Sequence, residues 1–460
     1  MKDQCVITRK VTVAAGVFAP GHLGELTQIV PFEMVDQALV ATGSTQARLR
    51  VLPSRVVVYL LLAGCLFAGL GYRQVWHKLT AGLGELPVAS PSDNALWQAR
   101  ARLGAAPLRW LFDLLRGPAT AITAGPVRWC GLLVCAIDGT TMTIPDSPRN
   151  LAAYGKQAGN HGGSGYPLLR LVALVTCGTR TIIDAVFGPT SCGELDCTRR
   201  LRRSLHAGML VLLDRNFDTA ALIGQLAATG AHLLVRLKRN RKLPVLRRYH
   251  DGSYLSQIGA VQVRVIECEI TVATSAGRHT GVYRLATTLL DHGQHPAPAL
   301  VTLYHQRWEI ETAYLELKAS ILGGQVLRAR TPAGVAQEVY ALLTCYQILR
   351  IAITDAIEAA GGIDPDRGSF TIALNAARDL TTQAANIIAD TIIDLIGAIG
   401  RRVLDNLLPD RRLRVSPRVV KRAISKYQAR GPDIDRTSYK ATISIDILAP
   451  PDTLTTAPNA

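Results

Sequence analysis

Two aspartates each follow directly after a short apolar run. Asp138 comes after residues 132–137, and Asp214 comes after residues 211–213. Runs of this length predict buried strands, and a carboxylate at the end of such a strand would be held rigidly at a sheet edge. Either aspartate could instead begin a turn. Asp218 is the better N-cap for the helix expected from residue 219, which leaves Asp214 available for other chemistry.

A third acidic candidate lies in the segment 304–318. If this segment is one α-helix, at about 100° per residue, four of its residues share a stripe about 60° wide: Tyr304, Arg307, Glu311 and Lys318. The acids Glu309 and Glu316 fall on the other side, so helical phase favours Glu311. A surface ladder with an ion pair between Arg307 and Glu311 is the alternative interpretation.

Three carboxylates of this kind suit Mg²⁺, which takes oxygen ligands and keeps water or phosphate in its shell. Two such ions, about 3.5–4 Å apart, can activate a nucleophile and stabilise a leaving oxygen in phosphoryl transfer. The ammonium group of Lys318 could hold a phosphate as a point charge. The sequence has no Walker A loop, no GxSxG elbow and no HExxH motif that would indicate another chemistry. The acids therefore predict metal-dependent phosphoryl transfer.

The charge balance indicates a polyanionic partner. The 460 residues include 51 Lys and Arg against 35 Asp and Glu, which gives a net charge of +16. Residues 401–430 hold half of that excess, and further basic runs lie at 199–203 and 236–248. Three such runs favour contact with a phosphate backbone over a merely solvated surface.

Composition excludes several other classes of protein. Hydrophobic residues make up 48% of the chain, which is enough for a sizeable core and excludes wholesale disorder. Nine cysteines are too few for a disulfide scaffold and fit a reducing cytoplasm. No signal peptide is expected. The uncharged run 56–72 is at the lower length limit of a membrane span, and its glycines favour a buried core helix.

The elements that must position the acids follow from the apolar periodicity. Residues 1–125 are expected to be mostly helical. Strands and helices then alternate: strands at 130–137, 168–176 and 181–187, a helix at 194–206, a strand at 209–213, a helix at 219–228 and a strand at 232–237. Residues 240–298 are β-rich, and a long helical pattern resumes at 303. This order predicts an α/β, ribonuclease-H-like domain with a mixed sheet and an insertion before its last helix.

The same residues resemble a known family, the DDE transposases of bacterial insertion sequences, and specifically the insertion-sequence-four family. The family signature, Tyr-x2-Arg-x3-Glu-x6-Lys, is complete here in Tyr304, Arg307, Glu311 and Lys318. Two further stretches resemble the family's aspartate motifs: Ile137-Asp138-Gly139-Thr140 and Leu213-Asp214-Arg215-Asn216-Phe217-Asp218. With the helical N-terminal region, residues 322–332 and the tail 418–426, the resemblance covers nearly the whole chain.

The resemblance implies an enzyme in which Asp138, Asp214 and Glu311 hold two Mg²⁺ ions, with Mn²⁺ as a substitute. It implies a homodimer that binds two terminal inverted repeats, cuts the DNA there and joins the 3′-OH ends to target DNA. In relatives the cut passes through a hairpin intermediate. Groups expected at the DNA are Tyr304, Arg307, Trp308, Lys318 and five basic residues at the entrance of the β-rich insertion: Arg236, Lys238, Arg239, Arg241 and Lys242.

Three regions are expected. Residues 1–125 form a helical domain that binds DNA ends. Residues 126–350 form the catalytic domain with its insertion at 240–298. Residues 351–460 form a helical, basic region with a disordered tail, in contact with DNA or with the second subunit. The protein is expected in the cytoplasm at the nucleoid, without a membrane partner. A nuclease that does not join ends, and a transposase-derived DNA-binding protein or inhibitor without strand transfer, remain as alternatives.

Overall fold

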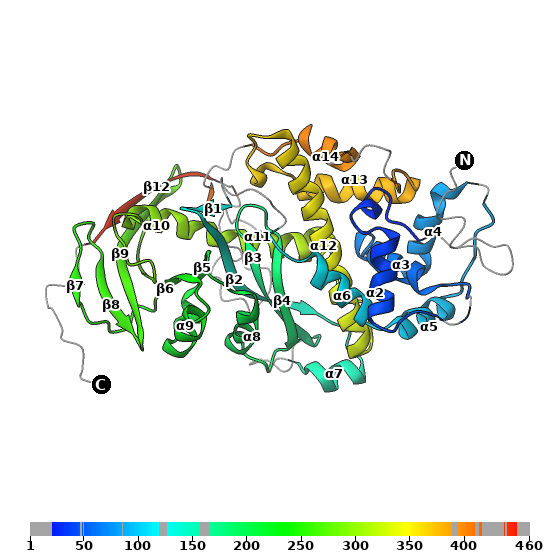
Figure 1. The fold of residues 1–460 in the computed structure, drawn as a ribbon, viewed down its shortest axis with the longest axis horizontal. Helices are drawn as coiled ribbons and strands as arrows, with labels where there is room; N and C mark the ends of the chain where they lie inside the picture. The colour runs from blue at the N-terminus through cyan, green and yellow to red at the C-terminus, as the bar shows by residue number, and fades with distance from the viewer. Residues whose placement is uncertain are drawn as a thin grey trace. The chain divides into compact units, whose positions relative to one another are not determined.

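The computed structural model describes residues 21–448, apart from residues 47, 49, 85, 119–126, 157–164, 389–393, 395, 410–413, 416–436 and 438. The chain forms two compact units (Figure 1). The first unit comprises residues 1–204 and 308–408, and the second comprises residues 205–307 and 409–460. The predicted disordered tail and most of the basic run 401–430 lie outside the described residues.

The first unit begins with helices that pack around one apolar helix. These are α2 (Phe32–Ala41), α3 (Ser54–Leu66), α4 (Tyr72–Thr80), α5 (Asp93–Leu103) and α6 (Ala106–Leu115). Every residue of α3 from Val56 to Leu66 is buried, and α2, α4 and α5 pack against it. Residues 56–66 of the uncharged run are therefore a core helix, as the composition indicated.

The long helix α12 (Pro332–Ala360) is the second core helix of this unit. It packs against α3, α6, α13 (Phe370–Gln383) and α14 (Gly397–Leu404). By length and composition alone α12 could cross a membrane, but 78% of its most apolar window is buried inside the protein. That burial is typical of the central helix of a helical bundle.

The sheet of the first unit is antiparallel, and β2 (Leu132–Thr143) is one of its inner strands. β2 pairs with β1 (Arg128–Trp129) and β3 (Leu168–Thr176), and β3 pairs with β4 (Ile182–Pro189). Figure 1 shows β2, β3 and β4 as neighbouring strands. Helix α8 (Glu194–Leu201) packs on β3 and β4, and α11 (Trp308–Leu315) packs on β2 and β3. The short helix α7 (Pro148–Tyr154) follows β2.

The first strand does not end at Asp138, as the apolar run had predicted. β2 continues to Thr143, and its register runs from Cys135 opposite Thr176 to Thr143 opposite Leu168. β-branched threonines extend the strand beyond the apolar run, and the long partner β3 supplies hydrogen bonds that a local pattern does not reveal. Asp138 therefore lies in the middle of a strand.

The second unit contains a parallel pair, β5 (Met209–Leu213) and β6 (His232–Arg236), joined by α9 (Ala220–Ala227). β10 (Gly277–Thr287) continues this sheet antiparallel to β6 and to β9 (Val261–Thr274). β8 (Tyr254–Ile258) pairs with β9 and with β7 (Arg247–Arg248). The insertion is thus β-rich, and α10 (Ala297–Tyr304) follows it.

One strand of the second unit comes from the region predicted to be helical. β12 (Tyr439–Ile447) pairs antiparallel with β9 and with β11 (Arg414–Val415). Its sequence alternates apolar and polar residues from Ile443 to Ile447, which is the period of a strand. Its partner lies about 170 residues earlier, so the pairing itself has no local signal.

The order of elements matches the expected one. Strands β2, β3 and β4, helix α8, strand β5, helix α9 and strand β6 follow one another, and the β-rich insertion precedes α10 and α11. The fold is ribonuclease-H-like, α/β, with a helical N-terminal part.

Candidate active site

Asp138 is half-buried in β2, and its backbone and side chain are both held. The N–H of Gly139 donates to Asp138 Oδ1 at 2.8 Å. The hydroxyl of Tyr314, from α11, donates to the backbone C=O of Asp138 at 2.6 Å. The carboxylate of Glu194 fills the space beside Gly139, since a Cβ on that glycine would lie 2.1 Å from Glu194 Oε1. No local sequence pattern singled out Tyr314 or Glu194, because Tyr314 reaches Asp138 and Glu194 reaches Gly139 only through tertiary packing.

Glu311 lies half-buried in α11, whereas its two acidic neighbours are committed elsewhere. Glu309 is 3% exposed and accepts a charged hydrogen bond from Arg180 Nε at 2.6 Å. Glu316 is paired with Arg180 Nη1 at 3.2 Å and with Arg350. Buried charges of this kind must stay paired, so Glu309 and Glu316 serve the core. Among the three glutamates of this segment, Glu311 is the one that is only half-buried.

The segment 304–318 is not the single α-helix assumed in the stripe argument. α10 ends at Tyr304, residues 305–307 form a 3₁₀ turn, and a π-helical segment (Glu316–Ile321) follows α11. A 3₁₀ turn advances by about 120° per residue and a π turn by less than an α turn, so the assumed phase holds only within α11. The chain also passes from the second unit to the first between Arg307 and Trp308.

Lys318 lies in the π-helical segment and contacts the strand of Asp138. Its Nζ donates to Thr140 Oγ1 at 3.1 Å, two residues beyond Asp138 in β2. Burial lowers the pKa of the Lys318 ammonium group. π-helical turns recur at functional sites. Within the first unit, the structure therefore brings Lys318 to the strand that carries Asp138.

The second unit groups Asp214 with two residues of the signature. Asp214 follows β5 and accepts a hydrogen bond from the N–H of Arg215 at 2.7 Å. The hydroxyl of Tyr304 donates to the C=O of Leu213 at 3.0 Å. Burial raises the pKa of Tyr304; the nearby charge of Arg307 opposes this shift, and that of Asp214 adds to it. Tyr304 and Arg307 thus lie near the second aspartate.

Asp218 does not cap the following helix, as the sequence had suggested. Thr219 is the N-cap of α9, and its hydroxyl accepts from the N–H of Leu222 at 3.4 Å. Asp218 is buried, pairs with Arg241 Nε at 2.6 Å and accepts from the N–H of Lys238 at 2.9 Å. It stabilises the chain that follows β6, and Arg241, predicted to contact DNA, is one of its partners.

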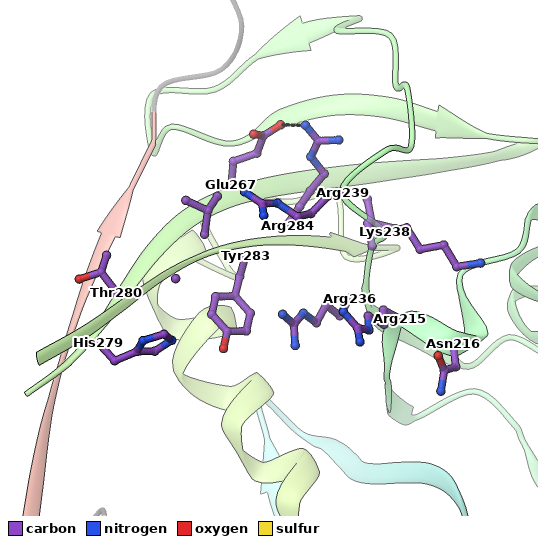
Figure 2. Close-up of a pocket in the computed structure, with 13 residues that line it drawn as sticks. Arg215, Asn216, Arg236, Lys238, Arg239, Glu267, His279, Thr280, Tyr283 and Arg284 are labelled. Atoms are coloured by element: carbon purple, nitrogen blue, oxygen red, sulfur yellow. Dashed lines mark ion pairs between the residues drawn. The ribbon is translucent and has the colours of Figure 1, made fainter. Parts of the chain in front are cut away.

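A basic groove of about 710 Å³ lies in the second unit (Figure 2). Three of the predicted DNA contacts line it: Arg236, Lys238 and Arg239. Arg215 and Arg284, which were not predicted to contact DNA, line it as well. The acid in the groove, Glu267, is neutralised by Arg284 at 2.9 Å. Figure 2 shows Tyr283 beside Arg236, whose guanidinium lies 4.1 Å from the ring centroid. Lys242 is exposed but does not line the groove.

The remaining predicted contacts differ in accessibility. Trp308 is 40% exposed at the start of α11, whereas Arg307 is 8% exposed. In the described part of the basic run 401–430, Arg401 pairs with Asp394 at 2.6 Å and Arg402 with Asp379 at 2.7 Å. These two arginines are therefore partly neutralised by acids on the protein's own surface.

The predicted triad fits a hard divalent cation by the chemistry of its donors. Asp138, Asp214 and Glu311 are each half-buried and offer carboxylate oxygens, which Mg²⁺ and Mn²⁺ prefer. Among the residues that the structure describes, no group of three His, Cys, Asp or Glu is gathered closely enough to hold an ion as it stands. A single metal site built from the three acids is therefore a proposal.

Two family models match the chain. The N-terminal domain of insertion element 4 transposases matches residues 20–113, and the transposase DDE domain matches residues 129–348. Together these matches span about two thirds of the chain. The chain belongs to the insertion-sequence-four family of DDE transposases, and it is an enzyme of DNA transposition.

Two curated relatives come from Escherichia coli strain K12. The transposase InsG for insertion sequence element IS4 is 27% identical over 412 residues, which cover 86% of this chain and 91% of the relative. The putative transposase InsZ is 28% identical over 209 residues, which cover 44% of this chain and 67% of the relative.

A solved structure of the piggyBac transposase synaptic complex with hairpin DNA has a TM-score of 0.42 and 9% identity, over 86% of both chains. That likeness is too weak to support a conclusion about this chain. DDE transposase domains act on DNA and use divalent metal ions, so the established class of this chain already includes both.

Proposed function

We propose that this enzyme cuts DNA at the ends of an insertion sequence and joins the freed 3′-OH ends to target DNA. In this proposal Asp138, Asp214 and Glu311 together hold two Mg²⁺ ions, for which Mn²⁺ can substitute. The observation that supports it best is the difference in burial among the glutamates: Glu309 and Glu316 are buried and paired with arginines, whereas Glu311 is only half-buried.

The chain's own residues then have distinct roles at the DNA. When bound, the metal ions would supply an activated water and stabilise the leaving oxygen. Lys318, next to Thr140, is placed to bind a phosphate near Asp138. Arg307 can hold a phosphate bidentately near Asp214 without ligating metal, and Tyr304 beside it fixes that region through the C=O of Leu213.

The basic groove of the second unit is proposed to contact the phosphate backbone of the transposon end. Five Lys and Arg residues with a paired acid leave a net positive concavity, and such a surface attracts DNA in a salt-dependent way. Trp308 is exposed enough to stack on an unpaired base, as a hairpin route would require.

A homodimer would hold two terminal inverted repeats, with residues 1–125 at the DNA ends and residues 351–460 at DNA or the second subunit. The enzyme would act in the cytoplasm at the nucleoid.

Single amide substitutions test the triad. Asp138→Asn, Asp214→Asn and Glu311→Gln should each abolish Mg²⁺-dependent nicking of a labelled transposon end, because amides ligate Mg²⁺ poorly. Binding of the same DNA in a gel-shift assay should be largely unchanged. Glu33→Gln, which changes an exposed acid on α2, is the matched control and should nick normally.

Normal nicking by one triad variant would remove that residue from the site. Wild-type protein that binds the ends but neither nicks nor joins them would favour the alternative of a DNA-binding protein or inhibitor. Nicking without joining of the 3′-OH to target DNA would favour a nuclease.

A further inference from the structure

One hydroxyl group links the strand of Asp138 to the helix of Glu311. Asp138 and Ala173 face each other in the antiparallel pair of β2 and β3. The hydroxyl of Tyr314 lies between them: it accepts from the N–H of Ala173 at 3.0 Å and donates to the C=O of Asp138 at 2.6 Å. Tyr314 stands one helical turn after Glu311 in α11. The bridge therefore connects the two elements that carry two of the proposed metal ligands.

The bridge is built to be rigid. Tyr314 is 7% exposed, and its helix packs against both β2 and β3. The two hydrogen bonds of its hydroxyl, to the C=O of Asp138 and from the N–H of Ala173, hold the side chain at both strands. At the residue pair Asp138 and Ala173, the strand groups thus bond to the hydroxyl of Tyr314.

We propose that Tyr314 is a positioning residue, which fixes the separation between Asp138 and Glu311 and so the geometry of the metal site. The inference rests on the proposed function, in which both carboxylates hold metal. Mg²⁺ demands near-ideal octahedral geometry with short bonds to oxygen, so a small shift of one carboxylate weakens its binding. Mn²⁺ suits the same oxygen ligands and is less demanding in geometry.

The test is a metal titration with the full-length protein and a labelled transposon end. In Tyr314→Phe, the Mg²⁺ concentration for half-maximal nicking should rise by about tenfold or more, as for other partners that orient metal ligands. Mn²⁺ should restore most of the rate, and DNA binding without metal should be unchanged. Tyr59→Phe is the matched control: Tyr59 is also buried, its hydroxyl donates to the C=O of Val30 at 2.7 Å, and its loss should not change the metal requirement.

Two results would overturn the proposal. One is an unchanged Mg²⁺ requirement in Tyr314→Phe. The other is an equal loss of rate in Mg²⁺ and in Mn²⁺ with a lowered melting temperature, which would mean a merely structural role. If Tyr314→Phe does not fold, Tyr314 is replaced by p-aminophenylalanine, whose amine can still donate and accept a hydrogen bond. A wild-type Mg²⁺ requirement of that variant supports the proposal, and a raised requirement contradicts it. Failure of the metal triad itself would be seen separately, as normal nicking by Asp138→Asn and Glu311→Gln.

Discussion

Glu309 and Glu311 are two residues apart, and the structure predicts opposite consequences for the same change in each. Glu309→Gln removes one charge from a buried cluster in which Arg180 also contacts Glu316 and Asp366. Two carboxylates remain on Arg180, so the loss should be below the 3–5 kcal/mol of a fully broken buried pair and near the value of a charged hydrogen bond, about 1.5–3 kcal/mol.

The assay combines thermal melting with nicking. A loss of that size corresponds to a melting temperature lowered by roughly 2–5 °C for a unit of about 300 residues, because the entropy of unfolding grows with size. Glu309→Gln should show this shift and yet nick DNA at 25 °C, whereas Glu311→Gln should melt close to wild type and not nick. If the Glu309→Gln variant melts like the wild type but does not nick DNA, the roles of Glu309 and Glu311 in α11 have been assigned wrongly, and Glu309 is the catalytic acid.

Three further predictions concern DNA, pH and the later steps of the reaction. One prediction concerns three residues of the basic groove, Arg236, Lys238 and Arg239. Neutralising them should flatten the dependence of DNA affinity on salt by up to about one unit of slope per residue. An unchanged slope would exclude the groove as a contact for the DNA backbone. Burial raises the pKa of Asp355 from 3.8 to about 6, so ionisation of its carboxyl group lowers the stability of the folded protein above that pH. The Asp355→Asn variant should therefore melt at a higher temperature than the wild type at pH 8 and at the same temperature near pH 4. An equal difference in melting temperature at both pH values would contradict this. Trp308→Ala should nick normally while nicked ends accumulate on denaturing gels, and complete cleavage at the wild-type rate would remove Trp308 from hairpin formation.

Local sequence patterns were enough to predict the order of the elements. An apolar run predicts a strand wherever that strand ends up, because side-chain alternation and burial act over a few residues. The choice of Glu311 as the third acid stays a prediction. Its phase difference from Glu309 holds because both residues lie within α11, whereas Glu316 lies in the π-helical segment, where the assumed turn of about 100° per residue does not apply.

Tertiary structure decided which groups surround each acid. Tyr314 meets Asp138 and Ala173 across 176 and 141 positions of sequence, and no local period carries that information. The register of β2 against β3 also placed Asp138 within a strand rather than at its end.

The same reason explains the other differences between sequence and structure. Asp218 stabilises the turn that follows a neighbouring parallel strand instead of capping its own helix. The groove brings Arg215, which follows β5, together with Tyr283 and Arg284 of β10. A sequence determines which residues can form strands, helices and charged groups. The long-range pairing of those elements, which depends on the free energy of the whole core, decides which of the groups meet.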